Sequence, residues 1–132
     1  MKKLLTSVLF LSLLAFSGFA FGNDDEPPSM TKLKERAASG EMAAQATLGA
    51  AYYIGYGGVS QNYNEAFKWL YKAAEQGDVE SQELVGIMYR SGQGDVPEDK
   101  EKAKEYFSRS CKGGNPRACN HYEKLTGSPL PQ

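Results

Sequence analysis

Apolar residues recur along the chain at intervals of three and four residues, the spacing that places them on one face of a helix. Glycine-rich breaks separate these amphipathic segments. No stretch alternates between apolar and polar residues for long enough to form a strand. The pattern therefore predicts an all-α fold of about six helices, at residues 29–39, 41–54, 62–76, 78–91, from 98 or 99 to the turn that contains Cys111, and 114–126.

The whole pattern repeats with a period of 37 residues and no gap. A shift of this size places glycine on glycine and aromatic on aromatic: Gly40 on Gly77, Gly49 on Gly86, Tyr52 on Tyr89, Gly55 on Gly92 and Trp69 on Tyr106. Such a period is typical of repeat proteins whose units stack around one continuous core. For residues 29–126 we therefore predict a right-handed α-solenoid of stacked antiparallel helix pairs, with a capping helix at 29–39, repeats at 40–76 and 77–113, and a half repeat at 114–126, before a tail at 127–132.

The first 22 residues have the layout of a secretory signal peptide. Lys2 and Lys3 precede an apolar, uncharged stretch at 4–16, and small residues near Ala20 and Gly22 suit cleavage after either one. An uncleaved membrane anchor is the alternative, but the apolar stretch is short and has no basic stop after it. We expect a periplasmic or secreted chain with no stable membrane insertion after cleavage, and a disordered acidic lead-in at 23–28.

The charge balance argues against one class of partner. The chain has 15 basic and 16 acidic residues, so removing Lys2 and Lys3 with the leader leaves 13 basic residues and a net charge of −3. No run of basic residues occurs. Because nucleic-acid binding depends on clustered positive charge, we do not expect a nucleic-acid partner.

A search for catalytic motifs finds one short match. Ser29-Met30-Thr31-Lys32 fits S-x-x-K, the motif around the nucleophile of penicillin-recognising enzymes, but neither S-D-N nor K-T-G occurs in the chain. A serine directly before a helix is more often its N-cap. His121, the only histidine, has too few companions for a zinc site. We predict a non-enzymatic protein with no cofactor and no metal.

The recurring motif is Gly-x3-Ala-Gln-x3-Gly-x2-Tyr-x2-Gly-x-Gly, followed by Ala-x2-Trp and Ala-Ala-x2-Gly. It resembles the Sel-1-like repeat, a relative of the tetratricopeptide repeat, from Ala37 to about Leu125. Ser81 and Val85 stand where alanine and leucine are usual in that family, and Asp95 is an additional acidic residue. The resemblance implies a scaffold whose partner is another protein or a peptide.

Cys111 and Cys119 match the placement of paired cysteines in some exported bacterial members of this family, a few of which are linked to penicillin binding. Independently of the resemblance, the two positions fall in neighbouring antiparallel helices, and a disulfide is the default for two cysteines in an exported chain. We therefore predict that they pair and fasten the last helix. A redox-active pair or metal ligation is the alternative, but no C-x-x-C spacing occurs.

The first helix of each pair commonly lines the concave side of such a stack. Five residues there are not demanded by the repeat and are candidates for binding a partner: Tyr53, Tyr56, Met88, Arg90 and the nearby Glu83. The alternative is that Tyr53 and Met88 only pack against a neighbouring helix. Together these features predict an exported scaffold, either an adaptor in an envelope pathway or an immunity-type protein that neutralises an exported toxin. A penicillin-binding or weakly β-lactam-hydrolysing protein is the alternative from another class.

Overall fold

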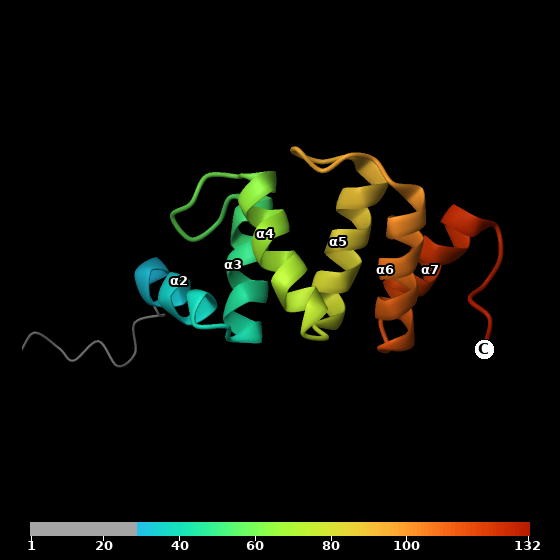
Figure 1. Cartoon of the computed structure of the whole chain (residues 1–132), viewed down its shortest axis with the longest axis horizontal. Helices are drawn as coiled ribbons and strands as arrows, with labels where there is room; N and C mark the ends of the chain where they lie inside the picture. The colour runs from blue at the N-terminus through green and yellow to red at the C-terminus, as the bar shows by residue number, and fades with distance from the viewer. Residues whose placement is uncertain (1–28) are drawn as a thin grey trace, which may run out of the picture.

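Six helices form at the predicted places in the computed structural model, which describes residues 29–132 (Figure 1). They are α2 (Met30–Ala38), α3 (Met42–Ile54), α4 (Tyr63–Glu75), α5 (Val79–Ser91), α6 (Lys100–Lys112) and α7 (Pro116–Thr126). Within this range there is no strand. The predicted signal peptide at 1–22 and lead-in at 23–28 lie outside the described residues.

Short polar side chains begin five of the six described helices, and a glycine lies at or directly after the C-terminal end of each helix. Asn62 begins α4 by accepting the backbone N–H groups of Asn64 and Glu65 at 3.0 and 3.1 Å. Gly55 ends α3 in the left-handed conformation, with φ of 74°, and Gly92 ends α5 in the same way, with φ of 63°. Since these residues recur with the 37-residue period, the helix ends recur with it.

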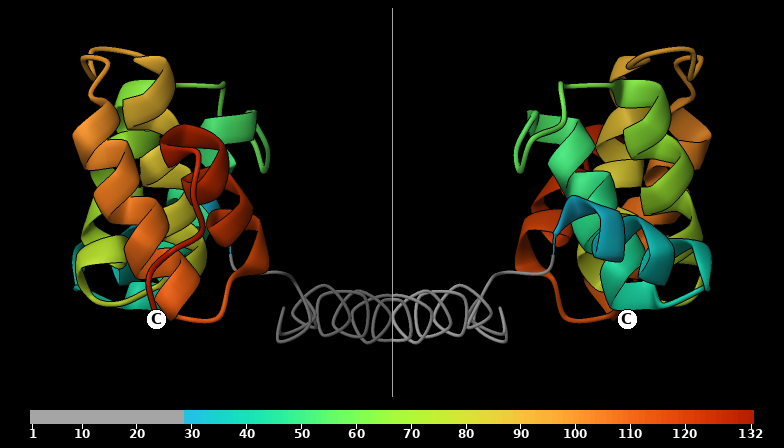
Figure 2. Two further views of the ribbon diagram at one scale, coloured as in Figure 1. Left: turned by 90° about the vertical axis from the view of Figure 1, so that its right-hand side faces the viewer. Right: turned by 90° about the vertical axis from the view of Figure 1, so that its left-hand side faces the viewer.

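The helices stack in a row as antiparallel pairs, which confirms the predicted all-α solenoid. Figure 1 shows α3 with α4 and α5 with α6 side by side, and the main contacts join consecutive helices along the chain. Seen from its two ends, the row presents α7 and the C-terminal tail on one side and α2 on the other (Figure 2). No helix of the described part is long and apolar enough to cross a membrane.

Glycines within the helices allow the paired helices to approach closely. A Cβ atom at Gly49 in α3 would lie 2.6 Å from the Leu70 side chain of α4. A Cβ atom at Gly86 in α5 would likewise lie 2.7 Å from the ring of Phe107 in α6. Both distances are shorter than any real contact, so only glycine fits at these two equivalent positions.

The two ends of the core are closed by different means. Leu33 and Ala37 of α2 pack with Trp69 in an apolar cluster at the N-terminal end, as expected for a capping helix. At the other end, Leu125 of α7 and Leu130 of the tail pack against the main core. The tail therefore covers part of the core surface at this end.

Asp95, the additional acidic residue of the second loop, joins the two repeats. Its carboxylate accepts a hydrogen bond from Asn64 Nδ2 at 2.7 Å, and its backbone N–H donates to Asn64 Oδ1 at 2.7 Å. This pair connects the loop between α5 and α6 to the first turn of α4. Asp95 therefore has a structural role, because it holds the loop between α5 and α6 against α4.

Candidate partner-binding groove

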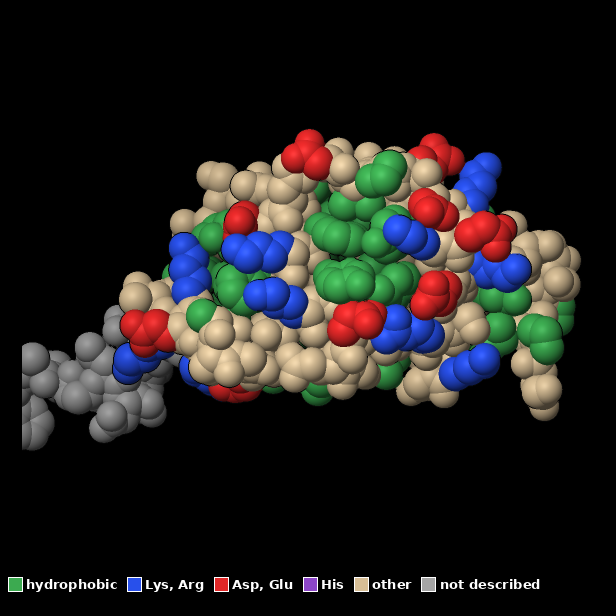
Figure 3. Space-filling view, in the orientation of Figure 1, with side chains coloured by type: hydrophobic (Ala, Val, Ile, Leu, Met, Phe, Trp, Pro, Cys, Tyr) green, Lys and Arg blue, Asp and Glu red, His purple; other side chains and the backbone are tan. Residues whose placement is uncertain are grey.

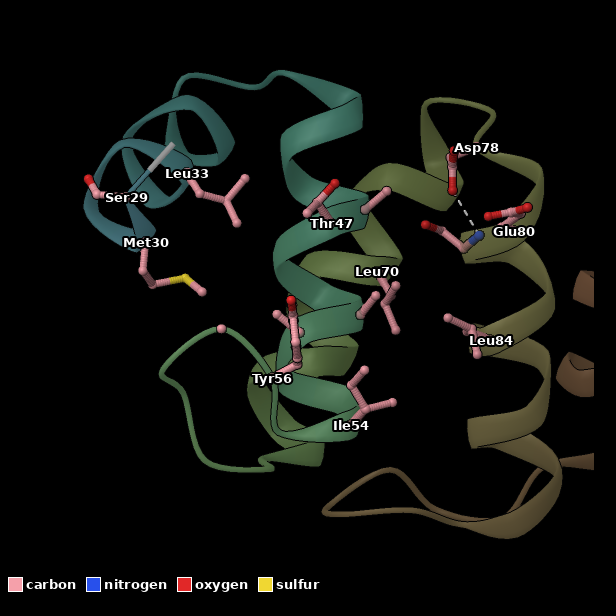
Figure 4. Close-up of a pocket in the computed structure, with 15 residues that line it drawn as sticks. Ser29, Met30, Leu33, Thr47, Ile54, Tyr56, Leu70, Asp78, Glu80 and Leu84 are labelled. Carbon is pink, nitrogen blue, oxygen red and sulfur yellow. Dashed lines mark hydrogen bonds between the residues drawn. The ribbon is translucent and has the colours of Figure 1, made fainter. Parts of the chain in front are cut away.

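An apolar groove of about 740 Å³ runs between α2, α3 and α5 (Figure 4). Three helices supply most of its lining: Met30 and Leu33 of α2, Ala46, Ala50 and Ile54 of α3, and Leu84 of α5. Leu70 of α4 lines it as well. The size falls within the range of clefts that hold small molecules or peptide side chains. This groove is the main candidate for a binding site in the described part of the chain.

The groove is open because the small side chains of Ala46 and Ala50 line it on α3, between larger side chains of α2 and α5. Longer side chains at these two positions would fill the space. Met30 closes the α2 side, and a Cβ atom at Gly57 would lie 3.1 Å from its terminal methyl carbon. The glycine loop after α3 can therefore pass directly against α2.

The two ends of the groove differ in chemistry. Figure 4 places Asp78 and Glu80 at one end and Ile54 and Tyr56 at the other. Ile54 is 65% exposed and Tyr56 is 73% exposed, so both offer apolar surface to a partner. The described residues that line the groove include no lysine, arginine or histidine.

Asp78 and Ser81 meet at the acidic end. Asp78 Oδ2 accepts the backbone N–H of Ser81 at 2.8 Å, the bond drawn as a dashed line in Figure 4, and so begins α5. Ser81 is only 1% exposed, and its hydroxyl has no hydrogen-bond partner among residues 29–132. A buried hydroxyl without a partner is uncommon in a native fold.

Of the residues predicted to bind a partner, Tyr56 lines the groove, while Tyr53 and Arg90 do not. The Tyr53 hydroxyl is 3.1 Å from Gln93 Oε1, to which it donates. Arg90 Nη1 donates to His121 Nδ1 at 3.0 Å. Both side chains are half-buried and join neighbouring repeats. These contacts within the fold are sufficient to explain why tyrosine and arginine stand at the two positions.

The structure corrects the prediction that Met88 and Glu83 offer surface to a partner. Met88 is fully buried and Glu83 is 5% exposed. Met88 follows Val85 by three residues on α5, and both lie on the face that packs into the main core. Glu83 faces α7, so a partner cannot reach its carboxylate without displacing that helix.

Glu83 is the centre of a polar cluster that sequence reasoning did not identify. Its Oε2 atom accepts a hydrogen bond from Asn115 Nδ2 at 2.8 Å and forms an ion pair with Arg117 Nη2 at 2.9 Å, and its Oε1 atom is 3.5 Å from His121 Nε2. The period of 37 residues places Glu83 on Ala46. The small Ala46 side chain leaves the groove open between α3 and α5. At the equivalent position of α5, the larger Glu83 side chain contacts α7, the first helix of the half repeat.

The two cysteines come together as predicted from the sequence. Cys111 at the end of α6 and Cys119 in α7 have Cα atoms 4.7 Å apart and sulfur atoms 2.05 Å apart. This is the geometry of a disulfide. A covalent bond here would tie α7 to α6, and its presence in the protein stays a prediction.

Ser29, the serine of the S-x-x-K match, lies at the start of α2. Its Oγ atom accepts the backbone N–H of Lys32 at 3.4 Å, in agreement with the N-cap interpretation. No group of three or more histidine, cysteine, aspartate or glutamate side chains in the described range is arranged to hold a metal ion.

The face that carries α4 and α6 has a different character. Figure 3 shows hydrophobic side chains gathered in the middle of this face, with charged side chains around them. The rings of Tyr89 in α5 and Tyr106 in α6 stack at 5.8 Å between centroids, with Lys102 5.2 Å above the first and Arg109 4.8 Å above the second. Cations of the chain therefore cover these two rings.

Comparisons with known proteins agree on one family. The model of the Sel1 repeat matches residues 43–78 and 79–115. A Sel1 repeat protein from Oxalobacter formigenes is 36% identical, over 73% of this chain and 27% of that one, with a TM-score of 0.68. A protective antigen present in uropathogenic Escherichia coli strains, which displays an SLR fold, is 30% identical over 70% of this chain and 19% of that one, with a TM-score of 0.65.

The chain spans about a quarter of the first of these solved structures and about a fifth of the second. No curated protein matches it. The matched repeats begin two or three residues later than the units read from the 37-residue period, at 43 and 79 instead of 40 and 77. This difference concerns where a repeat is said to begin and leaves the helices unchanged.

Proposed function

Because the chain belongs to the Sel1 repeat family, we propose that it is an exported scaffold that binds a segment of another protein in the groove between α2, α3 and α5. Sel1 repeat proteins are generally non-enzymatic scaffolds that bind other proteins. The observation that carries the proposal is the open apolar groove, with Ile54 and Tyr56 exposed at one end. Recognition then depends on a preformed surface and needs no cofactor.

Two features support export. Residues 1–22 have the charge and apolar pattern of a secretory signal peptide. Cys111 and Cys119 are placed to form a disulfide, a bond that persists in oxidising compartments such as the bacterial periplasm. The proposed location is therefore the periplasm or the medium, where the partner would be an envelope protein or an exported toxin.

Filling the groove tests the proposed function. Ala50→Trp places a large ring in the groove, and Ala43→Trp makes the same change at an exposed position of α3 that does not line it. In affinity capture from envelope extracts with quantitative mass spectrometry, we expect Ala50→Trp to lose the partner that the wild type and Ala43→Trp retain. Equal capture by both variants would place the binding surface elsewhere.

The identity of the captured protein separates the two proposed roles. An envelope component would indicate an adaptor, and an exported toxin would indicate an immunity-type protein. In the second case, the wild-type protein should protect cells from that toxin and Ala50→Trp should not. Growth of cells that carry the toxin, with either variant, measures the difference.

A further inference from the structure

The groove carries charge at one end only. We infer that the bound segment is apolar and carries a lysine or arginine that pairs with Asp78 and Glu80. This inference rests on the proposed function, because it names the chemistry of the segment that the same groove binds. Three features of the groove support it: the charges of its lining, the unpartnered hydroxyl of Ser81 and the different chemistry of its two ends.

Asp78 and Glu80 are the only charged residues among the described ones that line the groove. Neither forms an ion pair with any lysine, arginine or histidine of residues 29–132. The first turn of α5 lies here, and its helix dipole offsets only about half of one negative charge. The end of the groove therefore remains negative. A purely apolar segment would remove water from these carboxylates without replacing it, which is unfavourable.

Ser81 provides an independent observation at the same end. Its side chain lines the groove, is 99% buried and has no hydrogen-bond partner in the described part of the chain. The equivalent residues of the other two first helices are Ala44 and Ala118, which carry no polar group. A serine oxygen accepts hydrogen bonds from an ammonium or guanidinium group. A cation held by the two carboxylates would lie beside this hydroxyl, which has no partner among residues 29–132.

The spacing of the two ends defines the segment further. In Figure 4, Thr47 lies level with the acidic end, and Ile54 lies at the apolar end. These residues are seven positions apart on α3, which corresponds to about 10 Å along the helix axis. The basic residue of the partner and its outermost apolar residue should therefore be about 10 Å apart, or roughly three residues in an extended segment.

The test uses peptides, so that it does not depend on knowing the natural partner. A library of random peptides displayed on phage is selected on the purified protein. We expect enriched peptides to combine apolar residues with a lysine or arginine. The affinity of one enriched peptide is then measured by fluorescence anisotropy at two salt concentrations, for the wild type and for the variants below.

The test variant is Asp78→Asn with Glu80→Gln, which removes both charges and keeps a residue that can begin α5. The matched control is Asp99→Asn with Glu101→Gln, at the same positions of α6 and outside the groove. We expect the test variant to bind about tenfold more weakly, with less dependence on salt, and the control to bind within about twofold of the wild type. Replacing the basic residue of the peptide by glutamine should weaken binding to the wild type and have little effect on the test variant.

Failure of the inference and failure of the proposed function give different outcomes. If the enriched peptides are apolar and lack a basic residue, or if the test variant binds them as the wild type does, the inference is wrong and the groove remains the binding site. If no peptide is enriched, or if Ala50→Trp binds the enriched peptides as Ala43→Trp does, the proposed function is wrong as well. Ser81→Ala gives a further readout, because we expect weaker peptide binding together with a higher unfolding midpoint.

Discussion

Ser81 of α5 and Ser110 of α6 are both buried, but only the Ser110 hydroxyl has hydrogen-bond partners among the described residues. Ser110 donates to the carbonyl oxygen of Val79 at 2.6 Å and accepts from Asn115 Nδ2 at 3.2 Å. Ser81, which is buried to the same degree, has no partner for its hydroxyl among the described residues. An unsatisfied buried polar group lowers stability, whereas a satisfied one contributes to it. At the scale of the residue, the effect of a buried hydroxyl on the free energy of unfolding therefore depends on the groups next to it.

This contrast gives a prediction with its own control. Ser81→Ala should raise the free energy of unfolding by about 1 kcal/mol, because it removes an unsatisfied hydroxyl. Ser110→Ala should lower the free energy of unfolding by about 1–2 kcal/mol, because it leaves the amide of Asn115 and the carbonyl of Val79 with one partner fewer. Urea unfolding followed by circular dichroism measures both. A loss of stability in Ser81→Ala as large as that in Ser110→Ala would show that Ser81 has a partner in the folded protein.

At the scale of the element, α7 is held by contacts with α5 and α6. The ring of His121 stacks on Phe107 at 5.0 Å between centroids, with Arg90 and Glu83 on its two nitrogens. Arginine only donates hydrogen bonds, so Nδ1 accepts and the neutral ring carries its proton on Nε2, facing Glu83. Protonation of Nδ1 would place a positive charge against Arg90.

A pH dependence of stability follows from His121. Burial, and then the charge of Arg90, lower the pKa of His121, with smaller contributions from Lys124 and Arg117, while Glu83 acts in the opposite direction. Below the unfolded value of about 6.5, the unfolded chain therefore binds the proton more readily than the folded one. We expect the free energy of unfolding to fall as the pH decreases from about 6.5 through the lower pKa of the folded state.

The matched variant is His121→Leu, which takes the residue found at the equivalent position 84. His121 is the only histidine in the chain, so the variant should lose the pH dependence between about 7 and 5.5. Chemical unfolding at a series of pH values measures it. An unchanged pH dependence in the variant would assign the effect to carboxylates instead.

At the scale of the whole molecule, the contacts that hold the fold together join consecutive helices. The groove belongs to α2, α3 and α5, whereas the Cys111–Cys119 pair joins α6 to α7. In a stack where each unit contacts mainly its neighbours, one end can open while the rest remains folded. The groove and the last helix should therefore respond separately to changes at the C-terminal end.

Breaking the cysteine pair tests this independence. Replacing Cys111 and Cys119 by serine should lower the free energy of unfolding by about 2–3 kcal/mol on the chain-entropy model for a loop of this size. Hydrogen exchange should become faster in α7 first, while amides of α3 and α5 keep their protection. Binding of a groove peptide should change less than twofold. Equal loss of protection in all helices would show that the stack opens as one unit.

Much of the fold is determined by the sequence alone, because its causes are local or periodic. Residues such as Asn62 and Gly55 begin and end helices through contacts with their own neighbours in the chain. The 37-residue period then predicts which helices pair, and with them the approach of Cys111 to Cys119. Family membership follows from the same motif.

Only the tertiary structure decided which surface is open. Met88 and Glu83 were predicted to face a partner, yet both are buried, because what covers a side chain belongs to another helix. The groove is open at Ala46 and bridged at Glu83, although the two positions are equivalent in the repeat. The missing partner of Ser81 likewise becomes visible only when all neighbours are in place. Accessibility and hydrogen-bond satisfaction are properties of the packed assembly, so spacing along the chain does not contain them.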